Sequence, residues 1–552
     1  MLISKFCETQ FSSYEDFRDR FKINVPENFN FAYDVVDELA RTKPDARALV
    51  WCDDKGSDKT FTFADMKRLS DQAASLFTSD GIRKGDVVMT LLRSKYQYWI
   101  CALALHKIGA VLLPATHQLM AKDLEYRFRA ASVAAVVSID DERLTAAIQH
   151  AQENAPSLRK KYVVGHAPEG FIDFDAALAA ASPDFQRPTG AEATTNEDLM
   201  LMYFTSGTTG MPKMVVHDFR YPLGHILTAK FWQDLHPGDL HFTHADTGWA
   251  KTSWGKIYGQ WICEAAIFVY DYENKFKPTD LLRVIEQHKV TVFCAPPTVF
   301  RFLIKADIEH YDLSCLRHCC IAGEPLNAEV YNKWKEITGL ELREGFGQSE
   351  TCVLIATFPW IAAKPGSTGR PSPHFNVKLL GGDGKEVEPG DEGEICIDIS
   401  RGRPAGLTCG YYHDPVKTAE IMYDGWYHTG DMAWMDEDGY LWFVGRADDV
   451  IKSSGYRIGP FEVESALLEH PSVLEAAITA VPDSERGQIV KATVVLVQGT
   501  VPSDALKKEL QDHVKRTTAP YKYPRIIEFV EEIPKTFSGK IKRAEIRSKD
   551  KR

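Results

Sequence analysis

The sequence predicts an α/β protein: a large N-terminal domain of helix-covered β-sheets with a small antiparallel β subdomain, followed by an α+β C-terminal domain. Short apolar runs alternate with amphipathic helical segments over most of the chain, which is typical of parallel sheets covered by helices. From about residue 365 glycine and proline become frequent, which favours short antiparallel strands. At 552 residues the chain is too long for one hydrophobic core, so several domains are expected.

The N-terminal part shows helices and strands in turn. A helix is expected over residues 64–79, because Met66, Leu69 and Ala73 recur at helical spacing and Gly81 stands where a helix C-cap is expected. The next segments are a strand at 87–92, an apolar helix near 96–108, a strand at 136–139, a helix at 281–288 and a strand at 290–295. This order favours a parallel sheet with helices on its faces.

Two changes in the pattern mark the predicted domain boundaries. Between about 365 and 447, strands at 376–380 and 394–399 lie beside turn signals such as Gly-Gly-Asp-Gly. Beyond this part, the expected order is a helix at 460–469, strands at 475–481 and 490–497, a helix at 504–517 and a strand at 526–529. We therefore expect an N-terminal domain of residues 1–447 and a C-terminal domain of residues 448–552.

Charge and cysteine content limit the classes of function. The net charge of −12 disfavours nucleic acid and anionic membranes as main partners. The eleven cysteines include no Cys-x-x-Cys pair, so a zinc site is disfavoured and free thiols in a reducing compartment are expected. The N-terminus shows no secretory signal, and the apolar stretch at 100–115 is too short to span a bilayer. These observations predict a cytoplasmic protein without an integral membrane segment.

Residues 203–215 carry the most informative local pattern. An apolar strand signal ends at Phe204, and hydroxyl residues and glycines fill the positions from Thr205 to Gly210. Glycine lets backbone N–H groups approach an anion, hydroxyls add donors, and Lys213 adds a positive charge. The pattern indicates a polyphosphate grip, although a flexible surface loop can have the same composition. It is not a Walker A motif, because the two glycines are three positions apart and methionine follows the lysine.

Further polar clusters along the chain are compatible with a nucleotide site. At 343–351, Phe346 lies between two glycines, where a ring can stack on a planar base, and Glu350 offers a carboxylate suited to magnesium. Asp431 follows a tight turn and can accept hydrogen bonds from ribose hydroxyls. Lys540 lies on a Gly-Lys loop near the C-terminus. Taken singly, these residues are also compatible with turn capping and solvated surface charge.

Taken together, five segments resemble those of the adenylate-forming superfamily of acyl-CoA synthetases, peptide-synthetase adenylation domains and luciferases. Their order and rough separations match from about residue 30 to 545, and the segments are 203–215, 343–351, 426–431, 445–458 and 534–543. Within the superfamily, residues 246–251, 519–525 and 534–540 look like medium-chain acyl-CoA synthetases. The resemblance implies that ATP activates a carboxylic acid to acyl-AMP with release of pyrophosphate, and that coenzyme A (CoA) then takes the acyl group and releases AMP.

The resemblance also implies roles for individual residues. Lys540 would bridge the acid and the α-phosphate, Ser349 would contact the α-phosphate, and Glu350 would hold Mg²⁺. The other implied nucleotide contacts are Thr205, Ser206, Gly207, Thr208, Thr209, Gly210 and Lys213 for the outer phosphates, Glu344, Gly345, Phe346, Gly347 and Gln348 in the segment whose phenyl ring stacks on adenine, and Asp431 and Arg446 for the ribose and phosphates.

In the superfamily the C-terminal domain carries both the lysine that corresponds to Lys540 and the residues that contact CoA. These two parts of the domain cannot occupy the same cleft at the same time. The resemblance therefore implies a mobile C-terminal domain that rotates between half-reactions about a hinge at Asp448. The CoA contacts expected from this domain are Ser454, Gly455, Tyr456, Arg457, Arg486, Lys515 and Arg525, of which the last three are equally compatible with solvated surface charge.

The acid is predicted to be larger than acetate. Acetyl-specific relatives carry a tryptophan where this chain has Gly347. The missing indole favours a medium-chain, branched or aryl acid. Trp249, Gly323 and Gly347 are expected to line the acyl pocket.

Two enzymatic alternatives stay open on the sequence. The acyl group could pass to a carrier-protein thiol, although the residues on the CoA side resemble CoA ligases. A phosphate-loop NTPase would release ADP and phosphate, and the glycine spacing disfavours it. A non-catalytic binding protein would be expected to lack Lys540 or Glu350. The expected partners are a small carboxylic acid, ATP and CoA. The sequence does not fix the oligomeric state, for which a monomer and a homodimer both stay open.

Overall fold

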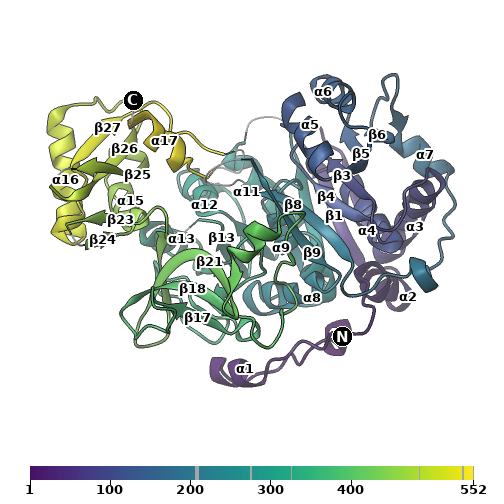
Figure 1. Cartoon of the computed structure of the whole chain (residues 1–552), viewed down its shortest axis with the longest axis horizontal. Helices are drawn as coiled ribbons and strands as arrows, with labels where there is room; N and C mark the ends of the chain where they lie inside the picture. Colours follow the sequence, from purple (N-terminus) through teal and green to yellow (C-terminus); the bar gives the residue numbers. More distant parts are fainter. Residues whose placement is uncertain are drawn as a thin grey trace.

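The computed structural model describes residues 1–205, 211–273, 276–324, 326–454, 456–483, 485–536 and 540–550. Within these ranges the strands form four sheets. Two large sheets and an antiparallel sheet belong to the chain up to residue 446, and the fourth sheet belongs to the C-terminal part. Figure 1 shows this C-terminal part, drawn in yellow and yellow-green, at one end of the molecule.

The first large sheet has the strand order β16-β15-β14-β13-β12-β10-β11-β1-β2. Its strands from β14 to β1 run parallel, and the edge strands are antiparallel to their neighbours. The strands are β1 (Arg47–Asp53), β2 (Asp58–Thr62), β10 (Leu240–Thr243), β11 (Ala266–Asp271), β12 (Val292–Ala295), β13 (His318–Ala322), β14 (Leu342–Phe346), β15 (Ile355–Ala356) and β16 (Arg370–Pro371).

The second large sheet has the order β19-β9-β8-β4-β3-β5-β6-β7. The strands from β8 to β7 run parallel, whereas β9 is antiparallel to both β8 and β19. The strands are β3 (Val87–Leu91), β4 (Val111–Pro114), β5 (Val133–Ile139), β6 (Lys160–Val164), β7 (Ile172–Asp173), β8 (Leu199–Thr205), β9 (Lys213–Asp218) and β19 (Gly410–Tyr411). Because Thr205 pairs with Lys213, the predicted phosphate loop begins and ends on neighbouring strands.

The two smaller sheets are formed by different parts of the chain. The antiparallel sheet contains β17 (Val377–Leu380), β18 (Glu392–Asp398), β20 (Met422–Tyr423), β21 (Trp426–Met435) and β22 (Leu441–Arg446). The C-terminal sheet contains β23 (Ile451–Ser453), β24 (Tyr456–Ile458), β25 (Val473–Asp483), β26 (Gly487–Leu496) and β27 (Ile526–Phe529). In the C-terminal sheet only the β26–β27 pair is parallel among the described residues.

Helices connect the parallel strands, as the sequence pattern predicts. They are α1 (Tyr14–Arg20), α2 (Glu38–Thr42), α3 (Phe63–Ser79), α4 (Gln97–Ile108), α5 (Ala121–Ala130), α6 (Glu142–Gln152), α7 (Phe174–Ala180), α8 (Tyr221–Ile226), α9 (Lys251–Gly255), α10 (Tyr258–Ile262), α11 (Pro278–His288), α12 (Pro297–Leu303), α13 (Ala328–Thr338), α14 (Pro415–Ala419), α15 (Pro460–Leu468), α16 (Asp504–Thr517) and α17 (Arg543–Asp550). Helix α3 shows the local rules: Thr62 and Asp65 form a capping box at its start, and Gly81 follows its end with φ +88°.

The predicted fold class is confirmed. Helix α16 and strand β27 have the predicted bounds, and the other segments named from the sequence agree within a few residues. The large sheets are mixed rather than purely parallel. The antiparallel strands at their edges include β2 and β9, each of which follows its partner strand after a connection too short for a parallel crossover.

The hydrophobic clusters separate near the predicted boundary. Among the described residues, no buried cluster combines residues before 442 with residues after 450. The C-terminal part still touches the rest of the chain, because the side-chain amide of Asn327 donates to the carbonyl of Ser465 at 3.2 Å. In the described part of the chain, every helix is too short or too polar to cross a bilayer.

A buried carboxyl group on β14 makes stability depend on pH. Glu344 is 6% exposed, and burial raises the pKa of its carboxyl to about 8. Its Oε2 atom has no hydrogen-bond partner among the described residues. The folded state therefore keeps a proton on Glu344 at pH values where the unfolded chain, with a pKa near 4.3, releases it.

We predict that Glu344→Gln removes this pH dependence. The stabilisation by the proton is complete below about pH 4.5 and is lost as the pH rises through about 8. Relative to Glu344→Gln, the unmodified protein should lose roughly 1.4 kcal/mol of unfolding free energy per pH unit across this window. Denaturant unfolding at several pH values measures the difference, with the exposed Glu336→Gln as control. Parallel pH curves for Glu344→Gln and the unmodified protein would contradict the prediction.

Candidate functional site

The predicted phosphate lysine and the predicted metal ligand lie on either side of one tyrosine. Lys213 begins β9, and its ammonium lies 4.8 Å from the ring centroid of Tyr411 on the neighbouring strand β19. The Tyr411 hydroxyl donates to Oε1 of Glu350 at 3.1 Å. Burial and the Glu350 charge raise the pKa of Tyr411, so the phenol keeps its proton. The chain thus places Lys213 and Glu350 at one site although they are far apart in sequence.

The loop after β14 is fixed by side chains from two other strands, β21 and β9. Gln348 accepts a hydrogen bond from the Tyr427 hydroxyl at 2.7 Å and donates to Oδ2 of Asp431 at 2.6 Å. The carbonyl of Ser349 accepts from Nε2 of His217 at 2.8 Å. Burial lowers the pKa of His217 to about 4, so the ring is neutral and donates from Nε2. His217 was not selected from the sequence, where a histidine inside an apolar strand gives no signal of this contact.

Asp431 and Arg446 face each other on paired strands. They are register partners in β21 and β22, and their Nη1 and Oδ1 atoms lie 3.6 Å apart. Burial raises the pKa of Asp431 to about 6, against the opposing effects of Arg446 and the Gln348 hydrogen bond. Gly430 makes this approach possible, because a Cβ there would lie 2.7 Å from the Arg446 guanidinium. The carboxylate and the guanidinium are therefore held at the edge of the site.

Lys540 approaches from the C-terminal part. Its charge is close enough to Asp431, and to Lys251 of α9, to lower the pKa of both groups. Its backbone pairs with that of Thr536, whose N–H donates to the Lys540 carbonyl at 2.8 Å. The positive charge of the predicted catalytic lysine therefore acts on the pKa of the predicted ribose carboxylate across the predicted domain boundary.

Glycines at the predicted nucleotide segment make room for two indole rings. A Cβ on Gly345 would lie 2.5 Å from the Trp232 ring, and a Cβ on Gly347 would lie 2.5 Å from the Trp254 ring. The space that the sequence predicted to be free beside Gly347 is therefore occupied by Trp254. Phe346 itself is partly exposed, with its ring centroid 6.0 Å from that of Phe443.

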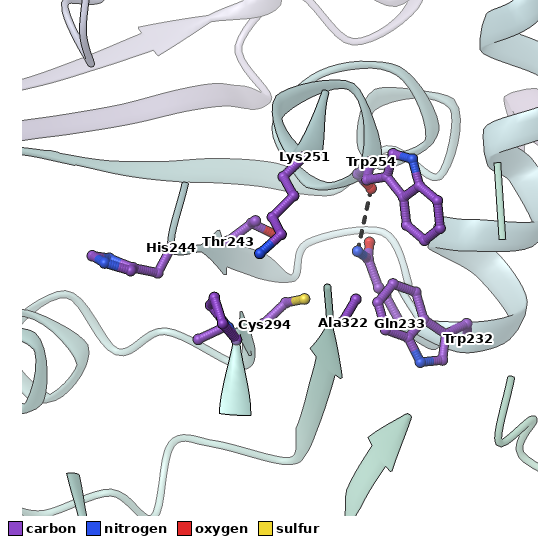
Figure 2. A pocket seen from close by; sticks show the side chains of 10 residues that line it. Trp232, Gln233, Thr243, His244, Lys251, Trp254, Cys294 and Ala322 are labelled. Atoms are coloured by element: carbon purple, nitrogen blue, oxygen red, sulfur yellow. Dashed lines mark hydrogen bonds between the residues drawn. The ribbon is translucent and has the colours of Figure 1, made fainter. Parts of the chain in front are cut away.

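A narrow cavity adjoins these glycines (Figure 2). Its free space of about 20 Å³ is room for one water molecule. The lining residues are Trp232, Gln233, Thr243, His244, Lys251, Trp254, Cys294, Ala295, Pro296 and Ala322. Trp249, predicted for the acyl pocket, is not among them, whereas Gly323 touches the cavity region through Lys251. Trp232, Trp254 and Lys251 were not selected from the sequence.

The predicted CoA residues form two groups in the C-terminal part. The first group contains Ser454 and Arg486, because the N–H of Ser454 donates to the carbonyl of Arg486 at 3.0 Å. Lys515 and Arg525 both lie over the ring of Tyr523, at 4.3 and 4.9 Å from its centroid. Tyr456 and Arg457 lie on β24, and the exposed ring of Tyr456 stacks on Tyr521 with centroids 4.1 Å apart. Within the described ranges, none of these side chains hydrogen-bonds or pairs with Lys540, Asp431 or Glu350.

Some predicted residues lie outside the described ranges. They are Ser206, Gly207, Thr208, Thr209 and Gly210 of the phosphate loop and Gly455 of the CoA side. Thr205, at the end of β8, and Asp448 are described. Asp448 lies in a turn after β22, where its Oδ1 is 3.6 Å from Nε of Arg446.

One cluster of potential metal ligands lies at the turn that precedes Asp431. Glu394, Cys396 and His428 present ligand atoms within 4.8 Å of one another, the one such group found in the described part of the chain. The Glu394 carboxylate already binds Nδ1 of His428 at 2.9 Å and accepts from the N–H of Gly430 at 2.8 Å. These bonds hold the turn that precedes Asp431, and they account for the cluster without an ion.

The chain matches known families over most of its length. Residues 36–412 match the AMP-binding enzyme family, and residues 462–540 match the AMP-binding enzyme C-terminal domain. It is 42% identical over 550 residues to mitochondrial acyl-coenzyme A synthetase ACSM3 of Rattus norvegicus, covering 98% of this chain and 94% of the relative. That relative is named as mitochondrial, so a cytoplasmic location for this chain is not confirmed.

Solved structures agree with these matches. The anthranilate CoA ligase AuaEII, solved with anthranoyl-AMP, superposes with a TM-score of 0.86 at 29% identity, covering 96% of this chain and 98% of that one. The acyl-CoA synthetase of Brucella canis gives a TM-score of 0.71 at 33% identity, covering 95% and 94%. The resemblance found in the sequence is confirmed: the chain belongs to the AMP-binding enzyme family and is related to the acyl-CoA synthetases within it.

Proposed function

We propose that this chain is an AMP-forming acid–thiol ligase that converts a carboxylic acid, ATP and CoA into acyl-CoA, AMP and pyrophosphate through an acyl-AMP intermediate. The observation that carries the proposal is the cluster in which Gln348 joins Asp431, Arg446 lies beside Asp431, and Tyr411 contacts Glu350, in a chain that matches both parts of the AMP-binding enzyme family. In a chain of this family, that geometry supports a complete site for the adenylation step. The names of the relatives, acyl-coenzyme A synthetase and CoA ligase, support CoA over a carrier-protein thiol as acceptor.

In the first half-reaction, the acid carboxylate attacks the α-phosphate while pyrophosphate leaves. We assign the outer phosphates to residues 205–210 and Lys213, and the α-phosphate to Ser349, whose backbone His217 holds in place. Asp431 would accept from the ribose hydroxyls, with Arg446 beside it. Lys540 would bind the carboxylate and the α-phosphate together, so that two anions can approach each other.

The adenine would stack on Phe346 in this assignment. The ring is partly exposed, and the glycines on either side carry no side chain that could cover it. Glu344 is buried beneath this segment, so its contribution would come from its backbone rather than from its carboxyl. Gln348 would act through Asp431, because it donates to the carboxylate that we assign to the ribose.

Glu350 has the chemistry required of a magnesium ligand. One carboxyl oxygen accepts from Tyr411, and the other has no hydrogen-bond partner among the described residues. Mg²⁺ prefers one or two carboxylates together with phosphate oxygens, which fits this single carboxylate beside the predicted phosphate loop. When bound, the ion would neutralise charge on the phosphates.

In the second half-reaction, the CoA thiol attacks the acyl carbon and AMP leaves. We assign CoA to Ser454, Gly455, Tyr456, Arg457, Arg486, Lys515 and Arg525, which lie in the same part as Lys540. Because this assignment gives Lys540 to the nucleotide in the first half-reaction, CoA binding would require this part to turn. We propose domains 1–447 and 448–552 with a hinge at Asp448, supported by the separation of the hydrophobic clusters there.

We propose a medium-chain, branched or aryl acid as substrate. The cavity beside Gly347 is lined by the aromatic rings of Trp232 and Trp254, which suit an apolar acyl group. Because its free space of about 20 Å³ holds one water molecule, such a group would enter only as these rings move. One solved relative is an anthranilate CoA ligase, which supports aryl acids as candidates. The free cysteines support a reducing compartment, so we keep the cytoplasm as the proposed location.

The proposed function is tested by supplying ATP, Mg²⁺ and CoA with acids from acetate through octanoate, 2-methylbutyrate and benzoate. We expect AMP, pyrophosphate and the acyl-CoA, with acetate among the poorest substrates. Release of ADP and phosphate would contradict the proposal. A carrier-protein thiol supplied in place of CoA separates the two acceptors, and we expect CoA to be used.

We predict that Lys540→Ala lowers acyl-AMP formation by roughly 100-fold or more, because it removes the cation between the two reacting anions. Thioester formation from supplied acyl-AMP should stay near its normal rate. Pyrophosphate exchange measures the first step, and acyl-CoA formation from synthetic acyl-AMP measures the second. An equal loss in both steps would refute the assignment.

We predict that Asp448→Pro keeps adenylation and stops thioester formation. The backbone carbonyl of Arg446 accepts hydrogen bonds from the N–H groups of Asp449 and Val450, so Asp448 lies inside a tight turn. Proline fixes φ near −65° and restricts the preceding residue, which prevents the turn from opening. Asp448→Ala, which removes the same carboxylate without fixing φ, is the matched control and should keep both steps. Unchanged thioester synthesis in the proline variant would rule out this hinge.

A further inference from the structure

Lys251 extends into the centre of the cavity that we assign to the acid. It begins α9, and Figure 2 shows its amine pointing into the space between Thr243, Cys294 and Ala322. The amine lies directly over Gly323, since a Cβ there would be 2.5 Å from Nζ of Lys251. The rest of the cavity wall is largely apolar and aromatic. A charged amine in such surroundings requires an explanation.

Lys251 has no hydrogen-bond or ion-pair partner among the described residues. The carboxylate that acts on it most strongly belongs to Glu324, which is not within ion-pair distance and accepts from the Thr298 hydroxyl at 2.6 Å. Burial lowers the pKa of the Lys251 amine, Glu324 opposes this effect, and Lys540 adds to it. A polar group in this setting is costly unless a ligand supplies the missing acceptor.

The second cation identifies the charge of that ligand. The charge of Lys540 contributes to lowering the pKa of the Lys251 amine, and two ammonium groups repel unless an anion lies near both. The charge of Lys540 also lowers the pKa of Asp431, the carboxylate that we assign to the ribose, whereas Lys251 lines the cavity. The position near both lysines is therefore where an acid in the cavity would present its carboxylate to the nucleotide.

We propose that Lys251 is a second carboxylate-binding residue, which holds the oxygen of the acid from the cavity side while Lys540 holds it from the nucleotide side. The proposal rests on the proposed function, because it takes the cavity as the acyl site. It goes beyond that function because it assigns Lys251, a residue of the N-terminal part, as a positive charge beside the reacting carbon.

This placement gives Lys251 a role in both half-reactions. Lys540 leaves when the C-terminal part turns, whereas Lys251 stays with the cavity and contacts the carbonyl oxygen of acyl-AMP. As the CoA sulfur forms its bond to the acyl carbon, the C–O bond to AMP breaks, its electron pair leaves with AMP, and the thiol proton goes to solvent. The Lys251 ammonium would stabilise the negative charge that develops on the carbonyl oxygen during this exchange.

Binding measurements test the proposal without turnover. Titration calorimetry compares hexanoate with hexanamide, and benzoate with benzamide, in the presence of α,β-methylene ATP, which cannot be cleaved at the α-phosphate. The unmodified protein should bind each carboxylate at least about tenfold more tightly than its neutral amide. Lys251→Met should lose most of this ratio, and Lys251→Arg should recover part of it. The exposed Lys305→Met is the matched control and should keep the full ratio.

The half-reactions provide a second readout. Lys251→Met should slow thioester formation from supplied acyl-AMP at least about tenfold, a step that Lys540→Ala leaves intact. An unchanged carboxylate-to-amide ratio in Lys251→Met, or an unchanged thioester step, would overturn the proposal. General damage to the cavity would weaken acid and amide equally, and that result also counts against it. If the unmodified protein makes no thioester from any acid, the proposed function fails, while the binding ratio still reports on Lys251.

Discussion

Repulsion between two anions is the constraint on which the site depends. A carboxylate and a triphosphate repel each other, so a site that joins them needs cations on several sides. The described site provides Lys213 from β9, Arg446 from β22 and Lys540 from the C-terminal part. Buried acids lie among them, and burial raises the pKa of Asp431 to about 6. The charges come from segments far apart in sequence, so only the folded chain can bring them to one site.

Neutral hydrogen-bonding groups hold these charges in position. His217 is uncharged because burial lowers its pKa to about 4, and it fixes the carbonyl of Ser349. Gln348 links the hydroxyl of Tyr427 to the carboxylate of Asp431, and Tyr411 separates Lys213 from Glu350. A charged group in any of these places would add to the electrostatic cost of burial. These hydrogen bonds therefore hold the charged residues in position without adding more charged groups to the interior.

The fold was more predictable from the sequence than the geometry of the site. Helix α16 and strand β27 were predicted with their bounds because apolar spacing reports local structure directly. Asp431 and Lys540 were selected because they lie in motifs with a fixed order, and their roles stay predictions. Tyr411 and Lys251 were missed, because each acts through neighbours far along the chain. Such contacts depend on strand pairing and on packing between sheets, neither of which leaves a periodic signal in one sequence.

Each glycine at this site leaves room for a large side chain from another segment. Read from the sequence, Gly347 indicated an absent side chain and a free volume, but the structure fills that volume with the ring of Trp254. Gly345 makes room for Trp232 in the same way, and Gly323 makes room for the amine of Lys251. Each of these three glycines is therefore paired with one large side chain from another segment, and those three large side chains line the cavity. Because close-packed interiors accommodate added atoms only by moving their neighbours, the shape of the cavity depends on both members of each pair.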